Sequence, residues 1–205
     1  MSNETPDQSG LYLYGVVRAR GWRGLERRNR DVLRVRYRDI EALVKPISFE
    51  LPNDSSDDVR AHQSVLESMM RRLTVLPAPY GVVFKDRRAL VKLLQEQYLV
   101  LDEGLSLLDG HWELRMHISG DAVGNEKDAL SDEAMSIYAE LRRFARAAVP
   151  LPGDDERIVS AAFLVERTSW TEFIERINAF GDQHKVLTFK VTGPWPAYDF
   201  VRVVV

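Results

Sequence analysis

The first half of the chain alternates between strand-like and helix-like patterns of apolar residues. Three strands are predicted, at Leu11–Val17, at Val32–Tyr37 with a continuation through Ile40–Val44, and at Tyr80–Phe84. One helix is predicted after the polar cluster Asn53–Asp58, with His62 on its apolar face. A second helix is predicted from about Asp86 to Leu108. Gly15, inside the first strand, indicates a bulge or a close approach of another backbone segment.

The second half predicts strands around two helices. Alternation is clearest at Trp112–Ile118, where apolar residues exchange with charged ones and histidine. After a polar loop at Ser119–Asp128, a helix is predicted from Ser131 to Ala148, and another follows the capping box of Ser169 and Glu172. The remaining predicted strands are Ile158–Val165, Val186–Thr192 and, after a rigid turn at Gly193–Pro196, Tyr198–Val205.

Long helices mixed with short strands predict an α+β protein made of two small domains. We expect a disordered leader at residues 1–10, an N-terminal α+β domain at 11–108 and a C-terminal α+β domain at 109–205. The C-terminal pattern fits a variant ferredoxin-like domain, in which helices cover one face of an antiparallel sheet.

Composition excludes several classes of protein. The 205 residues include no cysteine, so the chain has no disulfide framework, thiolate zinc site, iron–sulfur cluster or cysteine nucleophile. The longest apolar runs, such as Ile158–Val165, are far shorter than the roughly 20 residues that span a bilayer. The polar N-terminus lacks the features of a signal peptide. We therefore expect a soluble cytoplasmic protein with no lipid membrane as partner.

The net charge of −3 hides a basic segment. Nine arginines and only two acidic residues lie between Arg18 and Arg38, a local balance of +7 that leaves −10 for the rest. Such a segment can bind an anionic partner, including nucleic acid. In Leu33–Arg38, however, arginine alternates strictly with apolar residues, which is typical of a half-buried antiparallel strand. A solvated strand face is the favoured interpretation.

No motif indicates catalysis or metal binding. His111 and His117 share a strand face but lie roughly 20 Å apart, and His62 fits a hydrogen-bonded core histidine. The sequence has no His-Glu-x-x-His, no phosphate-binding glycine loop before a helix and no Gly-x-Ser-x-Gly turn. Acidic pairs at Asp57–Asp58 and Asp154–Asp155 fit helix caps and turns. We predict no enzymatic activity, metal or cofactor, although a site built from scattered residues would leave no motif.

Two segments combine proline with aromatic residues, Leu76–Phe84 and Thr192–Phe200. Proline pre-orders the backbone and aromatic rings supply large contact areas, a combination suited to docking a protein partner. The candidate protein-binding residues are Tyr80, Gly81, Phe84, Pro194, Trp195, Pro196 and Tyr198. The alternative is that Trp195 and Tyr198 simply pack over the edge of the sheet.

These segments resemble the gas vesicle protein L/F family. The shared features occur in the family's order, from about Leu11 to Val205, and they are Tyr14–Val17, His62, Val75–Phe84, Trp112–Ile118, Ser160–Val165 and Thr192–Val201. The closing Thr-Gly-Pro-Trp-Pro-x-Tyr-x-Phe-Val motif is the most specific. Two sites depart from the family pattern: Ala78–Tyr80, usually a basic residue and Phe, and Ala197, usually Pro.

The resemblance implies a non-enzymatic accessory or minor structural protein of gas vesicles. It implies binding to the small hydrophobic shell protein and to other accessory proteins, and help with vesicle assembly or nucleation. The implied location is the gas vesicle, with a cytoplasmic stage before or during assembly. Two alternatives remain, a ferredoxin-like regulatory module that binds a small ligand and a nucleic-acid binder that uses the basic strand. The sequence shows neither a ligand pocket nor aromatic residues on the arginine face.

Overall fold

The computed structural model describes residues 9–19, 31–48, 56–120, 126–153 and 156–201. These residues form two compact units. The first contains the described residues through Asp109 together with Val201, and the second is Gly110–Phe200. The division into domains at 11–108 and 109–205 stays a prediction. Residues 1–8 of the predicted leader lie outside the described residues, and Ser9 and Gly10 belong to the first strand. Over these ranges, no helix has both the length and the apolar character needed to cross a bilayer.

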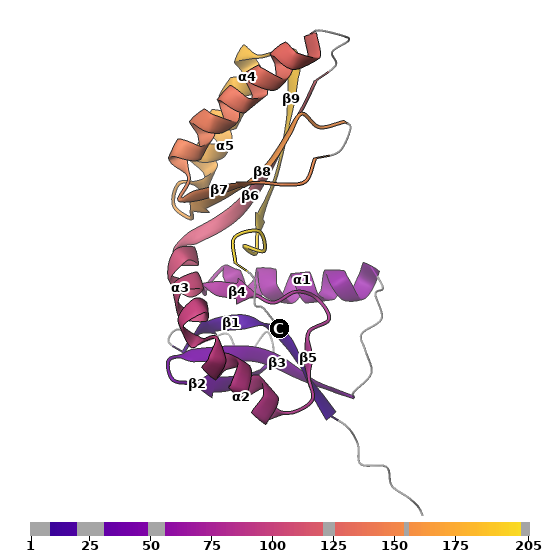
Figure 1. Cartoon of the computed structure of the whole chain (residues 1–205), viewed down its shortest axis with the longest axis vertical. Helices are drawn as coiled ribbons and strands as arrows, with labels where there is room; N and C mark the ends of the chain where they lie inside the picture. Colours follow the sequence, from indigo (N-terminus) through magenta and orange to yellow (C-terminus); the bar gives the residue numbers. More distant parts are fainter. Residues whose placement is uncertain (1–8, 20–30, 49–55, 121–125, 154–155, 202–205) are drawn as a thin grey trace, which may run out of the picture. The chain divides into compact units, whose positions relative to one another are not determined.

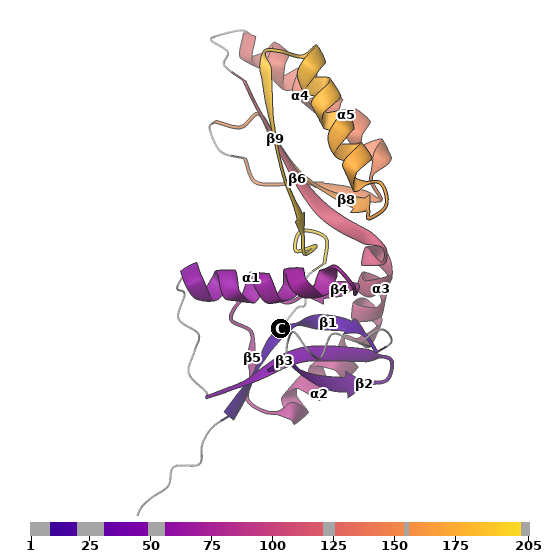
Figure 2. The same ribbon diagram turned by 180° about the vertical axis from the view of Figure 1, so that it is seen from behind.

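The first unit is a five-stranded antiparallel sheet with three helices. Its strands are β1 (Ser9–Arg18), β2 (Leu33–Tyr37), β3 (Ile40–Ser48), β4 (Val75–Pro77) and β5 (Val83–Phe84), and its helices are α1 (Ser56–Met70), α2 (Arg87–Glu96) and α3 (Tyr98–Leu108). The strand order is β2-β3-β1-β4, and β5 also pairs with β1. Helix α1 packs over β1 and β4, and α2 packs against β2 on the opposite side of the sheet (Figures 1 and 2).

Strand β2 has the half-buried alternation that its sequence predicts. Val35 is only 3% exposed, whereas Arg34 and Arg36 are exposed. A two-residue turn at Arg38 and Asp39 then leads into β3, with Tyr37 paired to Ile40. Leu33, on the same face as Val35, is 50% exposed and Arg38 lies in the turn, so the interpretation as a half-buried strand with one solvated face is confirmed for residues 34–37 only.

The arginines described at both ends of the basic segment have protein partners. Arg18 forms ion pairs with Asp39 and Asp102, and it donates a hydrogen bond to the Ser106 hydroxyl. Arg34 pairs with the buried carboxylate of Glu41 at 3.5 Å. The central arginines of the segment lie outside the described residues. Where it is described, the segment is therefore integrated into the first unit.

The prediction of a single helix from Asp86 to Leu108 is wrong in the number of helices. The chain forms two helices, α2 and α3, because Gln97 leaves helical geometry at φ −103° and ψ 13°. Asp86 caps the first of them by accepting a hydrogen bond from the Ala89 N–H at 2.7 Å. Leucines at helical spacing continue across the break, which hides it from pattern analysis.

The second unit has the βαββαβ order of a ferredoxin-like fold. Its elements are β6 (His111–Gly120), α4 (Glu126–Leu141), β7 (Ala147–Pro150), β8 (Val159–Glu166), α5 (Trp170–Gln183) and β9 (Leu187–Trp195). All strand pairs are antiparallel, in the order β7-β8-β6-β9. Both helices cover the same face of this sheet (Figures 1 and 2). The α+β class and the ferredoxin-like C-terminal half are confirmed.

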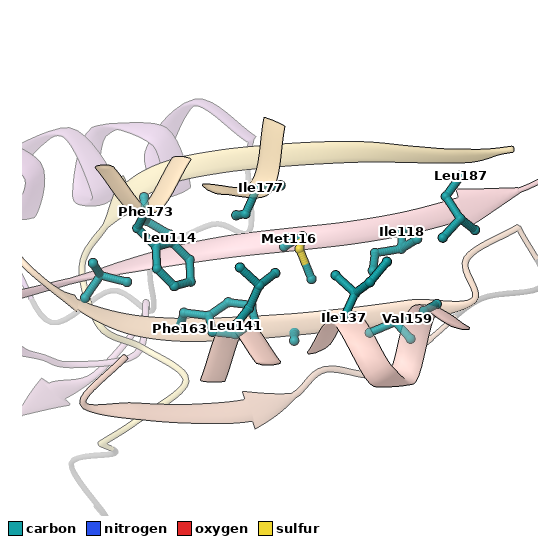
Figure 3. Packing of buried hydrophobic residues seen from close by; sticks show 13 residues of the cluster. Leu114, Met116, Ile118, Ile137, Leu141, Val159, Phe163, Phe173, Ile177 and Leu187 are labelled. Atoms are coloured by element: carbon teal, nitrogen blue, oxygen red, sulfur yellow. The ribbon is translucent and has the colours of Figure 1, made fainter. Parts of the chain in front are cut away.

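The core of the second unit lies between that sheet and its helices. Leu114, Met116 and Ile118 project from β6 toward the helices, as the alternation in this strand predicts. Figure 3 shows them packed with Ile137 and Leu141 of α4, Phe173 and Ile177 of α5, and Val159, Phe163 and Leu187. This buried cluster fixes the helices on one side of the sheet.

Two elements of the second unit differ from the sequence predictions. The helix expected from Ser131 to Ala148 begins earlier, at Glu126, and ends at Leu141. A 3₁₀ turn at Arg142–Phe144 then leads into β7. Ala145 and Ala148 do pack against the core, so their helix-like spacing misled the prediction. The strand predicted at Tyr198–Val205 is a turn at residues 198–200, and its last four residues lie outside the described residues. Strand β9 instead continues through the predicted turn as far as Trp195.

Candidate protein-binding segments

The first aromatic segment, Leu76–Phe84, lies along β1 in two pieces. Strand β4 pairs with Gly15–Val17 and β5 pairs with Leu11 and Tyr12. Between them, the Ala78 N–H donates to the Tyr14 carbonyl and the Leu13 N–H donates to the Val82 carbonyl, both at 2.9 Å. The segment is therefore bonded to β1 on both sides of the loop that carries Tyr80.

Gly15 permits this close pairing. The register of β1 shifts between Leu13 and Gly15, which marks a bulge. A Cβ atom at Gly15 would lie 2.6 Å from the Leu76 carbonyl oxygen. Both expectations for Gly15, a bulge and a close backbone approach, are confirmed.

A buried histidine fixes the first segment from the side of α1. The Tyr12 hydroxyl is 2.7 Å from His62 Nδ1, and His62 Nε2 is 3.2 Å from the Ala78 carbonyl oxygen. Because a carbonyl can only accept, Nε2 carries the proton and Nδ1 accepts from Tyr12. Burial lowers the pKa of His62, although the bond to Ala78 opposes this shift. The prediction that His62 is a hydrogen-bonded core histidine is confirmed.

Tyr80 and Gly81 are the candidate residues of this segment that reach the surface. Tyr80 is half-buried, and its ring edge contacts His62 at a centroid distance of 5.8 Å and Tyr12 at 6.2 Å. Gly81 has φ +87° with open space beside it. Phe84 is only 8% exposed and belongs to the core. The segment thus presents a ring whose position is set by a buried aromatic cluster.

The second aromatic segment, Thr192–Phe200, follows the end of β9. Trp195 pairs with Glu113 of β6, and its indole N–H donates to the Thr192 hydroxyl at 3.1 Å. Gly193 has φ +122°, and a Cβ atom there would lie 2.8 Å from the Glu113 carbonyl oxygen. The backbone at this point therefore requires glycine.

The candidate residues of the second segment divide into exposed and buried ones. Pro194, Trp195 and Tyr198 are half-buried, whereas Pro196 is buried. The Tyr198 N–H donates to the Pro196 carbonyl at 2.7 Å and closes a tight turn. Because the two aromatic segments belong to different units, each is described by itself.

A buried carboxylate fixes the second segment. Glu113 is 0% exposed, and its Oε2 accepts from the Asp199 N–H at 3.0 Å. Arg115 Nε lies 2.8 Å from Glu113 Oε1 and 2.9 Å from Asp199 Oδ2. Burial raises the pKa of Glu113 to about 7, and the Asp199 carboxylate adds to that shift, whereas the Asp199 N–H and Arg115 oppose it.

Sequence analysis did not identify this cluster. Glu113 occupies a polar position of an alternating strand, where a solvated side chain is the ordinary expectation. The one available signal was Asp199, an acidic residue within an otherwise apolar and aromatic motif. Its partner could not be found without the fold, because 86 positions separate Asp199 from Glu113.

The described residues form a recess in the first unit but no grouping of metal ligands. Across the described part of the chain, no three His, Asp or Glu side chains are grouped so that they could hold a metal ion. A recess of about 400 Å³ in the first unit is lined by Arg18, Arg72, Thr74 and Ser106, among others. Arg18 is already bonded there to Asp102 and Ser106, so the recess does not favour the small-ligand alternative.

The chain thus consists of two α+β units, and each carries a proline–aromatic segment that a buried polar side chain holds in place. Sequence and structure comparisons identify the family of proteins to which it belongs. The family model described as "Gas vesicle synthesis protein GvpL/GvpF" matches residues 10–136 and 120–202. The chain therefore belongs to the gas vesicle GvpL/GvpF family. The resemblance inferred from the sequence motifs is confirmed.

Individual relatives agree with this assignment. Gas vesicle protein F1 of Halobacterium salinarum is 28% identical, covering 94% of this chain and 93% of the relative. Gas vesicle protein F of Haloferax mediterranei is also 28% identical, with coverage of 94% and 93%. The crystal structure of GvpF from Anabaena sp. PCC7120 matches with a TM-score of 0.77 at 22% identity, covering 94% of this chain and 98% of that one. GvpF from Microcystis aeruginosa has a TM-score of 0.79 at 19% identity, with coverage of 96% and 99%.

Membership of this family gives the protein a gas vesicle-related role and an association with gas vesicle components. The family is one of structural and accessory proteins. The crystal structures support the fold alone, since their identity to this chain is low.

Proposed function

We propose that this protein is a non-enzymatic accessory or minor structural protein that binds the hydrophobic gas vesicle shell protein and assists vesicle assembly or nucleation. Tyr80 with Gly81 in the first unit, and Pro194, Trp195 and Tyr198 in the second, contact the partner. Phe84 and Pro196 hold the two segments in place from inside. The protein acts at the gas vesicle, after a cytoplasmic stage in which it meets the shell protein and other accessory proteins.

One observation carries this proposal beyond family membership. In each segment a half-exposed aromatic residue lies close to a buried, hydrogen-bonded anchor, His62 for Tyr80 and Glu113 for the turn that carries Tyr198. Trp195 is restrained as well, because its indole N–H is bonded to Thr192. Pre-ordered aromatic rings lose little conformational entropy on binding and commonly dominate interface energies.

The test is shell-protein binding by the double variant Trp195→Ala/Tyr198→Ala and by Tyr80→Ala. Loss of an aromatic residue at a binding hot spot costs at least about 2 kcal/mol, roughly thirtyfold in affinity. We therefore expect co-purification with co-expressed shell protein to fall sharply for the double variant, with an unchanged thermal melt. Tyr80→Ala reports on the first segment separately.

Leu99→Ala is the matched control, since it removes a large apolar side chain that is 71% exposed and lies outside both segments. It should leave shell binding intact. Undiminished binding by a folded double variant would exclude the second segment as a contact surface. A fall in binding that merely follows a lowered melting temperature would instead show that Trp195 and Tyr198 act as core residues.

A further inference from the structure

The outer face of α4 is exposed, and the described charged side chains of its stripe, Asp128 and Asp132, are acidic. Leu130, Ala134, Ile137 and Leu141 face the core of the second unit, so the opposite stripe of the helix meets solvent. That stripe contains Asp128, Asp132, Met135 and Ala139, all exposed. Met135, an apolar side chain at the centre of this stripe, is 50% exposed.

Positively charged side chains follow directly after the end of α4. Arg142, Arg143 and Arg146 are exposed, and none of them forms an ion pair with a described residue. Phe144 lies among them and is 47% exposed. The guanidinium of Arg176 stacks on its ring, 4.1 Å from the centroid, so the ring has a defined position. Exposed aromatic rings beside arginines are typical of protein interfaces.

The acidic stripe of α4 and the arginines after its end are complementary in charge when two copies of the helix lie antiparallel. Consider a second α4 that lies alongside in the opposite direction, with the two-fold axis crossing the helix pair at the level of residue 137. Asp132 then faces Arg142 of the other copy. In the same register Met135 faces the small side chain of Ala139. Asp128 then faces the turn that carries Phe144 and Arg146. Each contact occurs twice, as a two-fold dimer requires.

We propose that the outer face of α4 and the following 3₁₀ turn form a self-association surface, which pairs two copies of this protein about a two-fold axis. The surface lies outside both aromatic segments and is independent of shell-protein binding. A pair of helices of this length buries less than the ~1,200 Å² of a standard interface. The dimer is therefore weak and depends on salt.

Charge complementarity favours a second copy over other occupants. A nucleic acid would meet the repulsion of Asp128 and Asp132 on the same stripe. A partner of uniformly acidic character would leave the acidic half of α4 unmatched. Another copy satisfies both signs at once and covers Met135 and Phe144.

The test is sedimentation velocity of the full chain at rising protein concentration, at about 50 mM and about 300 mM salt. We expect a monomer–dimer equilibrium that weakens at least tenfold at the higher salt. Among the named charges of this surface, Arg142→Glu/Arg143→Glu leaves only Arg146 positive, and Asp128→Arg/Asp132→Arg makes all of them positive. Each variant alone should be monomeric, and an equimolar mixture should form a heterodimer at least as strong as the wild-type dimer.

Matched controls are Arg71→Glu and Glu103→Lys, which change exposed charges of the first unit directly after α1 and on α3. They should leave the dimer unchanged. Because the chain has no cysteine, Ser136→Cys places one thiol close to the expected axis and should form an oxidised dimer faster than Ala179→Cys on α5. Circular dichroism melts confirm that each variant is folded.

Three results would overturn the proposal. One is a wild-type protein that stays monomeric at low salt up to several hundred micromolar. Another is a failure of the two charge-reversed variants to associate when mixed. Growth of the mass beyond a dimer with concentration would exclude the two-fold arrangement. Oligonucleotide binding that is lost in Arg142→Glu/Arg143→Glu, without self-association of the wild type, would assign the arginines to nucleic acid instead.

Discussion

The two aromatic segments are each fixed by a buried ionisable side chain, but the chemistry of the two anchors is opposite. His62 is uncharged and donates to the Ala78 carbonyl of the first segment. Glu113 is an acid that accepts from the Asp199 N–H of the second segment. Burial disfavours the charged form of both residues, so it lowers the pKa of His62 and raises that of Glu113.

The consequence is an opposite dependence of stability on pH. For His62 the unfolded chain binds more protons in acid, so its contribution is present above about pH 6.5 and is lost as the pH falls. For Glu113 the folded chain binds more protons, so its contribution is present below about pH 4.5 and is lost as the pH rises through about 7. Acid should loosen the first segment, whereas neutral and alkaline conditions should loosen the second.

The largest expected effect comes from the backbone contact that supports the Glu113 anchor. Gly193→Ala should lower the free energy of unfolding by about 3 to 5 kcal/mol, because the new Cβ would meet the Glu113 carbonyl at 2.8 Å and φ is +122°. Gly153→Ala is the matched control, since its Cβ would have no neighbour closer than 3.9 Å. Urea unfolding compares the two variants. An equally small loss in both would show that β9 does not approach β6 as closely as described.

The same contact shows what the sequence could and could not predict. Gly15 and Gly193 are visible as glycines in or beside strands, and for Gly15 the close approach was predicted correctly from that position alone. Helices, most strands and the ferredoxin-like half follow from periodicity, because each has one apolar face. The end of α4 and strand β7 could not be predicted from periodicity. The alanines at residues 145 and 148 suit a helix or a short edge strand equally well.

The candidate segments were predictable as sequence motifs, but their anchors were only partly so. His62 could be assigned to the core because it lies on the apolar stripe of a helix. Glu113 could not be assigned, because alternation fixes the face of a strand on which a side chain lies and not what covers that face. The pairing of Glu113 with Asp199 depends on the tertiary fold alone.

A second, smaller effect tests the Glu113 anchor directly. In the wild type, the shift of the Glu113 pKa from 4.5 to about 7 should reduce stability by up to about 3 kcal/mol between pH 5 and pH 8. Glu113→Gln keeps an oxygen acceptor for the Asp199 N–H but cannot ionise. The variant should therefore lack this loss, so its stability relative to the wild type should rise by up to about 3 kcal/mol from pH 5 to pH 8, while the opposite contribution of His62 stays in both proteins. Urea unfolding at each pH provides the measurement, and equal slopes in both proteins would exclude Glu113 as their source.

The smallest expected effect tests His62 and completes the comparison. His62→Gln should destabilise the first segment by about 1 to 2 kcal/mol at pH 7.5, because it removes one buried hydrogen bond and the ring that stacks on Tyr14. The difference in unfolding free energy between the two proteins should narrow toward pH 5, where the contribution of His62 to the wild type is lost. Amide hydrogen exchange at Ala78, whose N–H is bonded to Tyr14, reports this locally once corrected for intrinsic exchange at each pH.

The Asp199 amide in the same sample is the internal control, because its N–H is bonded to Glu113 in the other unit. Its protection should be unaffected by His62→Gln and should rise in the wild type as the pH falls, while that of Ala78 declines. Parallel changes at the two amides would mean that the chain opens globally, and separate pH responses of the segments would then be excluded. Opposite changes would establish that each segment is held by its own anchor, since burial suppresses a positive charge at one and a negative charge at the other.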